Sequence, residues 1–246
     1  MTMEIAADCV RRMEEDGFAI LPDVLAPARV DAVLRELAAA FGDPGREGAI
    51  STQEGTVYAA RNVLTLWPGA ADVWRAGALP EVLAALLGPY CGLVRVLFFD
   101  KPPQQTWALG WHKDLTIAVR DNRLPSQHFV KPTCKAGVAH VEAPEEVLRS
   151  MLAVRLHLDA ATEENGPLRV IPGSHRTGKR LVLGDIAPVT VLTGRGAALL
   201  MRPLLAHSSG RSHPDTPQHR RVLHLEFAAR PELADGYAWH TFLPAR

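Results

Sequence analysis

Short strand-like segments follow one another from about Val94 onward, and they constrain the fold more than any other feature of the sequence. They are rich in β-branched, leucine and aromatic residues, and Gly, Pro and Asn signals separate them. The segments are VRVLFFD, LTIAV, MLAVRLHLD, LRVI, VTVL, AALLM and RRVLHLEF. So many short strands predict an all-β core of two facing sheets, as in a jelly roll.

The first third of the chain has a different, largely helical pattern. Apolar residues recur at helical spacing in three stretches, around residues 5–13, 27–41 and 80–88, while FAILPDVL resembles a strand. We therefore predict a mainly β protein with helices, in which N-terminal helices buttress a double-stranded β-helix (jelly-roll, cupin-like) core. A chain of 246 residues suits one domain. Its expected parts are a mostly helical buttress (1–93), the jelly-roll core (94–230) and a C-terminal tail (231–246).

Composition argues against several classes of partner. Lys plus Arg (27) equals Asp plus Glu (27), so no net field favours nucleic acid or an anionic membrane. No stretch has the length and apolarity of a membrane span, and the first residues lack the apolar region of a signal peptide. Cys9, Cys91 and Cys134 form no C-x-x-C motif and fit reduced thiols. We expect a cytoplasmic monomer or small homo-oligomer that acts on a small molecule.

Two of the strand-like segments predict a polar interior. In AVRLHLD the apolar residues alternate with Arg155, His157 and Asp159, and in RRVLHLEF they alternate with polar residues that include His224. Successive side chains of a strand point to opposite faces. If the helices cover the apolar faces, the polar faces line the interior of the jelly roll. Buried polar groups cost free energy, so such an interior indicates a functional site.

An H-x-D pair, His112 and Asp114, lies in WHKDLTIAVR, where a strand would point both side chains to one side. A second pair, His157 and Asp159, has the same spacing, so spacing alone does not choose between them. A third ligand would come from the late histidines, at positions 207, 213, 219 and 224. We favour His207, because it ends the strand-like run AALLMRPLLAH and could face the early pair across the core.

Two histidines and one carboxylate form the facial triad of non-haem Fe(II) oxygenases, which leaves coordination positions open. A structural zinc site would more often include cysteine, and no cysteine lies near these residues in the sequence. If 2-oxoglutarate binds such an iron, its distal carboxylate needs a buried cation, best an arginine. Alternation places Arg220 on the polar face of its strand and Arg221 on the apolar face. Arg220 is therefore the predicted partner.

The chain resembles the phytanoyl-CoA dioxygenase family of Fe(II)/2-oxoglutarate oxygenases over nearly its whole length. Four segments carry the resemblance in the family's order: EDGFAILPDVLAPARVDAVL, FFDKPPQQTWALGWHKDLTIAV, VRLHLDAATEENGPLRVIPGSHRTG and LLAHSSGRSHPDTPQHRRVLHLEF. The resemblance implies that His112, Asp114 and His207 hold Fe(II). It further implies that Arg220, thirteen residues after the distal histidine (220 − 207), binds 2-oxoglutarate, with Ser209 beside the same carboxylate.

The same resemblance implies an activity. Dioxygen and 2-oxoglutarate would be consumed, with release of succinate and CO2, while an unactivated C–H bond of a small molecule is hydroxylated. The His157–Asp159 pair would not be the ligand pair, and His157 would lie near the pocket. Halogenating relatives carry a small residue where this chain has Asp114, so hydroxylation is expected.

Two other interpretations stay open at this point. One is a cupin-like metalloenzyme that does not use 2-oxoglutarate, and the other is a noncatalytic jelly-roll binding protein. The walls of the pocket are expected from residues 42–57, a predicted mobile lid, and 121–136, with Trp107 and Trp111 as candidates to shape it. An acyl-CoA, an amino acid and a terpenoid remain alternative substrates. A CoA ester would need a basic patch, for which Arg176, Lys179 and Arg180 are candidates.

Overall fold

The computed structural model describes residues 2–42, 50–53, 56–103 and 107–245. Its helices are α1 (Thr2–Glu15), α2 (Pro27–Phe41), α3 (Val63–Leu66), α4 (Leu79–Leu87) and α5 (Glu145–Arg149), with short 3-10 turns at Pro68–Ala71, Glu163–Asn165 and Ser174–Thr177. Its strands are β1 (Phe18–Leu21), β2 (Ile50–Gln53), β3 (Thr56–Ala60), β4 (Gly92–Phe99), β5 (Leu109–His112), β6 (Thr116–Val119), β7 (Val130–Lys135), β8 (Val138–Glu142), β9 (Met151–His157), β10 (Leu168–Val170), β11 (Val189–Val191), β12 (Ala198–Met201), β13 (His207–Ser209), β14 (Val222–Ala228) and β15 (Leu243–Pro244).

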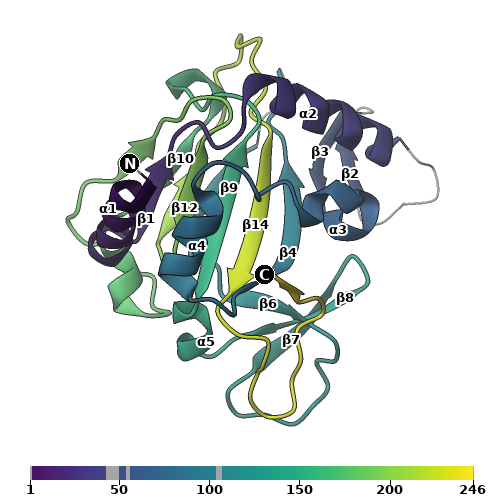
Figure 1. The fold of residues 1–246 in the computed structure, drawn as a ribbon, viewed down its shortest axis with the longest axis vertical. Helices are drawn as coiled ribbons and strands as arrows, with labels where there is room; N and C mark the ends of the chain where they lie inside the picture. The colour runs from purple at the N-terminus through teal and green to yellow at the C-terminus, as the bar shows by residue number, and fades with distance from the viewer. Residues whose placement is uncertain (1, 43–49, 54–55, 104–106, 246) are drawn as a thin grey trace.

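Three antiparallel sheets form the core of the described residues (Figure 1). The main sheet has eight strands in the order β1-β12-β9-β14-β4-β3-β2, with β15 added to β4. A second sheet has the order β11-β10-β13-β5, and a third has the order β6-β8-β7. Non-consecutive neighbours such as β9 and β14 are the crossovers expected of a jelly roll. The predicted mainly β class is confirmed.

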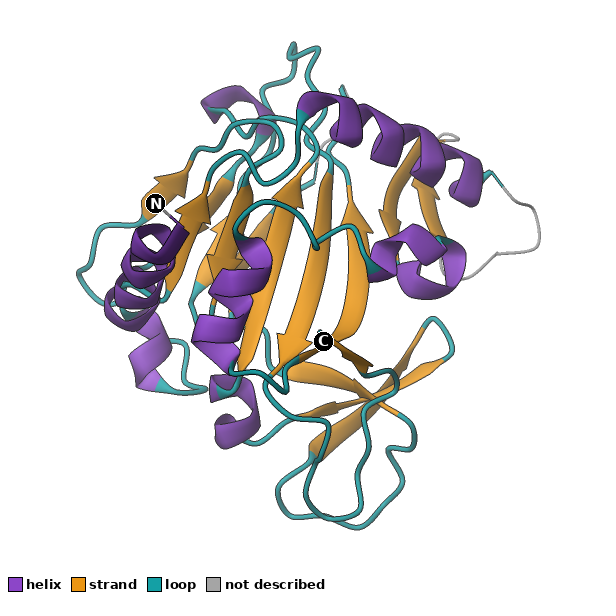
Figure 2. Cartoon of the chain, viewed as in Figure 1, coloured by secondary structure: helices purple, strands orange, loops and turns teal. Residues whose placement is uncertain are grey.

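Helices cover one face of the main sheet, as predicted. Figure 2 shows α1, α4 and α2 on the side of the sheet turned to the viewer. Val154 and Leu156 of β9 and Leu225 of β14 pack there against helical residues such as Val33 and Leu83, all of them buried. Pro27 begins α2 at a position where its missing N–H is not needed. The apolar faces of β9 and β14 thus point outward under helices, and their polar faces point inward.

The N-terminal region contains more sheet than the sequence predicted. Besides β1, it supplies β2 and β3 to the edge of the main sheet, and β2 and the first residues of β3 fall within the stretch predicted as a lid at 42–57. Residues 43–49 and 54–55 of that stretch lie outside the described residues. Within the predicted loop 121–136, the strand β7 pairs with β8. Its sequence, VKPTCK, lacks apolar alternation because most of its side chains are exposed. Over the described ranges, no helix is long and apolar enough to cross a bilayer.

Candidate metal centre

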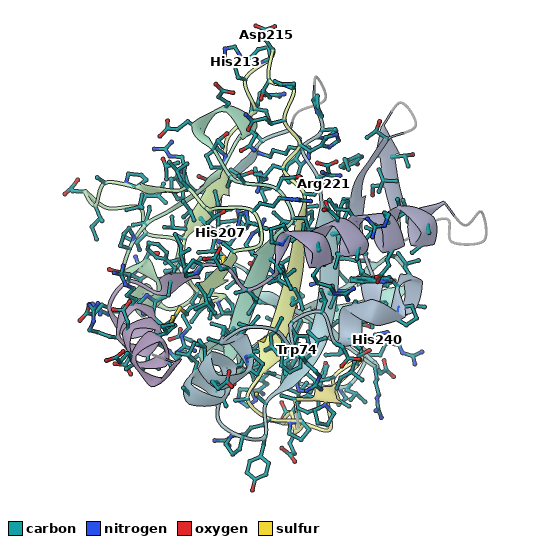
Figure 3. All side chains as sticks on the ribbon, turned by 45° about the horizontal axis from the view of Figure 1, so that its top comes forward. Trp74, His207, His213, Asp215, Arg221 and His240 are labelled. Carbon is teal, nitrogen blue, oxygen red and sulfur yellow. The ribbon has the colours of Figure 1, made fainter. Side chains whose placement is uncertain are left out.

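Two histidines from distant parts of the chain meet across one pair of strands. The strands β5 and β13 are antiparallel neighbours, and their register pairs His112 directly with His207. The centroids of the two imidazole rings are 4.1 Å apart. Figure 3 shows His207 well inside the molecule. Strand pairing, and not a local motif, therefore brings the two predicted histidines together.

Asp114 completes the cluster from just beyond β5. Its carboxylate oxygens lie 3.6 Å from Nε2 of His207 and 3.9 Å from Nε2 of His112. Candidate ligand atoms of the three residues all lie within 4.8 Å of one another, and among the described residues this is the one such group of His, Cys, Asp or Glu found. The expectation that His112 and Asp114 share one strand is wrong: β5 ends at His112, and the backbone N–H of Asp114 donates to the carbonyl of Pro203.

The residue between the two early ligands is an anchor that the sequence did not reveal. Lys113 is buried, and its ammonium donates to the carbonyls of Ser174 and Gly178 and to the hydroxyl of Thr177, at 2.8, 2.6 and 2.9 Å. The acceptors belong to the 3-10 turn Ser174–Thr177 and to Gly178, which directly follows it. Because Lys113 is held in that turn, the side chains on either side of it are left to face the cavity.

Both imidazoles have the hydrogen bonds expected of metal ligands. Nδ1 of His112 lies 2.7 Å from the carbonyl of Gly110, and Nδ1 of His207 lies 2.9 Å from that of Leu205. An Nδ1–H donated to a carbonyl leaves Nε2 as the lone-pair nitrogen, which faces Asp114. Burial lowers the pKa of His207 to about 4, so the ring is neutral near pH 7. Burial would raise the pKa of Asp114, but the imidazoles around it hold that pKa below its usual value.

The rival H-x-D pair is used differently. Asp159 accepts two hydrogen bonds from the guanidinium of Arg221, at 2.7 and 2.8 Å. His157 is buried, and neither of its ring nitrogens has a hydrogen-bond partner among the described residues. Of the other late histidines, His213 is exposed at the tip of a loop (Figure 3) and His219 binds Asp100. The structure brings neither residue of the rival pair into the metal cluster.

Arg220 lies in the interior, as alternation predicted. Arg221 lies in a partly exposed ion pair with Asp159, so the prediction that Asp159 shares the inward face of Arg155 and His157 is wrong. Arg220 is 1% exposed, and its Nε and Nη1 find no hydrogen-bond partner in the described part of the chain. Burial and the neighbouring guanidinium of Arg155 lower the pKa of Arg220 to about 9, so it remains a cation near neutral pH. A buried cation with two free donors is a binding position for an anion.

Lys101 links Arg220 to Ser209, which lines the cavity. The backbones of Lys101 and Arg220 are hydrogen-bonded, and the Lys101 ammonium donates to Oγ of Ser209 at 2.9 Å and to the carbonyls of Gly166 and Gly210. Burial, followed by the charge of Arg220, lowers the pKa of Lys101 to about 7. Gly166 has φ +64°, and a Cβ there would meet the ammonium at 2.9 Å. No sequence pattern indicated Lys101, because its partners come from distant loops.

A cavity of about 480 Å³ connects the metal cluster with Ser209, the hydroxyl that Lys101 contacts. It is lined by His112, Asp114, His207, Ser209 and Arg155, and Trp107 forms part of its wall. Such a volume is typical of small-molecule sites. Trp111, the other tryptophan considered, instead lies under the guanidinium of Arg169. The two predicted wall segments contribute one described lining residue each, Ser51 and Lys135.

The polar interior predicts acid sensitivity. Burial lowers the pKa of His140 to about 4 and that of His157 to about 3, against 6.5 for a free histidine. Between pH 6.5 and these lowered pKa values, the two histidines are protonated in the unfolded chain but not in the folded chain. The free energy of unfolding therefore falls as pH falls below 6.5. We expect the melting temperature to drop steeply there, and His140→Gln to reduce the slope. A melting temperature that is level down to pH 4 would contradict this assignment.

A comparison with family models matches residues 13–222 to the phytanoyl-CoA dioxygenase (PhyH) family. The chain belongs to this family, which confirms the resemblance and the predicted class of enzyme. No curated protein matches the sequence.

Solved structures share the fold. EvdMO1 is 23% identical with a TM-score of 0.64; the match covers 91% of this chain but 50% of EvdMO1, so the chain spans half the length of that relative. EctD from S. alaskensis, solved with 2-oxoglutarate and 5-hydroxyectoine, is 21% identical with a TM-score of 0.67, over 93% of this chain and 76% of EctD. SnoK, a non-heme alpha ketoglutarate dependent carbocyclase, is 17% identical with a TM-score of 0.66, over 96% and 90%.

Proposed function

We propose that this protein is an Fe(II)- and 2-oxoglutarate-dependent oxygenase that hydroxylates an unactivated C–H bond of a small molecule. The observation that carries the proposal is the convergence of His112, Asp114 and His207 on one cavity. Beyond it lies the buried Arg220, whose Nε and Nη1 have no hydrogen-bond partner among the described residues. Family membership and the likeness to EctD, whose structure holds 2-oxoglutarate, support it.

The residues present fit iron and its cosubstrate. Two imidazoles and one carboxylate are the donor set of non-haem Fe(II) oxygenases, and they would hold the metal. Arg220 would bind the distal carboxylate of 2-oxoglutarate in its fork, with Ser209 beside it. When bound, iron and 2-oxoglutarate supply the oxidising power: one oxygen atom of O2 enters the substrate and the other enters succinate, with loss of CO2.

The protein's own residues bind, orient and shield. Lys113 fixes the direction of both early ligands, and the Nδ1 hydrogen bonds fix the histidine rings. Leu109, Leu168 and Phe99 give the cavity apolar walls beside the cluster, which limit the access of water to the reacting centre. These contacts place a substrate C–H bond without taking part in the chemistry.

Hydroxylation, and not halogenation, is the expected outcome, because the Asp114 carboxylate fills the position that a halide would need. The test is a substrate screen read out by succinate, followed by the mass of the product. Each turnover should form one succinate per product, and the product should gain the mass of one oxygen atom. A chlorinated product would contradict the role of Asp114, and turnover without 2-oxoglutarate would contradict the proposal as a whole.

A reducing compartment is also proposed. Cys9 and Cys91 are buried, Cys134 is exposed, and all three are free thiols. An exposed free thiol fits the cytoplasm better than an oxidising environment.

A further inference from the structure

A second group of cations lines the cavity. Arg61 directly follows β3, Arg95 lies in β4, and Lys135 ends β7, and all three are lining residues together with Glu226 of β14. None of them belongs to the metal cluster or to the proposed cosubstrate site. We call Arg61, Arg95 and Lys135 the cationic wall.

The cationic wall lies several residues away from Arg220 along the paired segments that contain Arg95 and Glu226. The strand register pairs Arg95 with Glu226, and backbone hydrogen bonds pair Lys101 with Arg220. Along each of the two segments these positions are six residues apart, from Arg95 to Lys101 and from Arg220 to Glu226. At about 3.3 Å per residue, each pair of Cα atoms is separated by roughly 20 Å. In the proposed function 2-oxoglutarate runs from Arg220 to the metal cluster, so both of its carboxylates are already engaged and the cationic wall is left free.

The metal cluster lies beside the cationic wall. The Lys135 ammonium donates to Oγ1 of Thr116 at 3.1 Å, and Thr116 is two residues from Asp114. A ligand bound at the wall would therefore extend past the cluster.

Charge at the wall is not balanced by the described residues. Glu226 accepts from Nη1 of Arg95 at 3.3 Å, and both side chains are nearly buried. Arg61 forms no ion pair within the described ranges, and the partner of Lys135 is a neutral hydroxyl. Burial, and then the charge of Arg95, lowers the pKa values of both Arg61 and Lys135. Like charges gathered in a partly buried place cost free energy, and a bound anion would offset that cost.

The exposed basic loop is a weaker candidate for the same role. Lys179 forms an ion pair with Glu142, and Arg176 donates to the carbonyl of Glu14. Two of its three cations are thus already engaged, whereas the cationic wall faces the cavity itself.

We propose that the substrate carries an anionic oxygen group, a carboxylate or a phosphate, which binds Arg61, Arg95 and Lys135 while its reacting C–H bond lies at the metal cluster. This inference rests on the proposed function. It favours acids over neutral terpenoids, and it makes the cationic wall the determinant of substrate class.

The test is calorimetric titration of the anaerobic Fe(II)–2-oxoglutarate protein with three probes: inorganic phosphate, hexanoate and hexanamide. At least one of the two anions should bind, whereas hexanamide, which has the size of hexanoate without its charge, should bind at least about tenfold more weakly, a difference of roughly 1.4 kcal/mol. A difference between phosphate and hexanoate would tell which anionic group is recognised. The affinities for iron and for 2-oxoglutarate are measured first, so that a failure of the proposed function is distinguished from a failure of this inference.

Variants locate the binding. The double variant Arg61→Gln/Lys135→Gln should lower the affinity for the anionic probes about tenfold or more and leave the affinity for 2-oxoglutarate unchanged. The matched control is Arg35→Gln, which removes an exposed arginine of α2 and should change nothing. Lys135→Arg keeps the positive charge and should keep most of the affinity for the anions. Its retained binding would show that the loss in the double variant comes from the missing charge and not from misfolding. Equal binding of hexanamide, no binding of either anion, or unchanged anion affinity in the double variant would each overturn the inference.

Discussion

His112→Ala is expected to abolish iron binding while the protein stays folded. His112 is one of the three proposed ligands and its side chain is 31% exposed, so its removal leaves little cavity in the core. Removing a residue that hydrogen-bonds a metal ligand already lowers metal affinity 10- to 100-fold, so removing the ligand itself should lower the affinity by more than about 100-fold. Metal analysis after anaerobic loading with Fe(II) measures the effect, and thermal unfolding of the metal-free protein checks the fold.

The matched control is the rival pair. Neither His157→Ala nor Asp159→Ala should change the iron content, because Asp159 is engaged by Arg221 and lies outside the cluster. Asp159→Ala does remove a partner of Arg221, so it should lower stability while leaving iron bound. The assignment of the metal centre would be wrong if these two variants lost iron and His112→Ala kept it.

Arg220→Ala should weaken the binding of 2-oxoglutarate by about 100-fold or more and leave iron bound. Removing one partner of a buried, hydrogen-bonded charge pair costs about 3–5 kcal/mol. Arg220→Lys should restore only part of the affinity, because an ammonium cannot form the bidentate fork. Anaerobic titration of 2-oxoglutarate into the Fe(II) protein, followed through the metal-to-ligand charge-transfer band, measures the dissociation constant directly.

Arg221→Ala serves as the neighbouring control. Its guanidinium binds Asp159 and is partly exposed, so the change in 2-oxoglutarate affinity should stay below about tenfold. If Arg221→Ala were the variant that lost the cosubstrate, the assignment of faces in β14 would be inverted. Arg155 would then be the next residue to test, since it is buried beside the cluster and lines the cavity.

Alternation along strands predicted the parts of the site that depend on a single strand. The faces of β9 and β14 could be predicted because each strand packs one side against helices and turns the other side inward, which separates Arg155 from Val154. The same alternation, continued to the two residues before β14, separates Arg220 from Arg221. The helices were predicted for the same reason: their apolar spacing reflects one buried face.

Contacts between distant segments could not be predicted in this way. Lys113 and Lys101 are buried because particular carbonyls of remote turns surround their ammonium groups, and composition does not encode those turns. Nor does alternation reveal that β5 ends at His112, since the end is set by its pairing with β13. The cationic wall likewise draws on three strands that become neighbours only in the folded chain.

The pairing of His112 with His207 has a further consequence for the folding equilibrium. A metal ion held by both would tie together residues that are 95 positions apart (207 − 112), and so would act as a reversible cross-link between β5 and β13. A cross-link that exists only in the native state raises the free energy of unfolding in proportion to the logarithm of the free metal concentration. Cells that are short of iron would then hold less of this protein, because more of it would be unfolded and open to proteolysis.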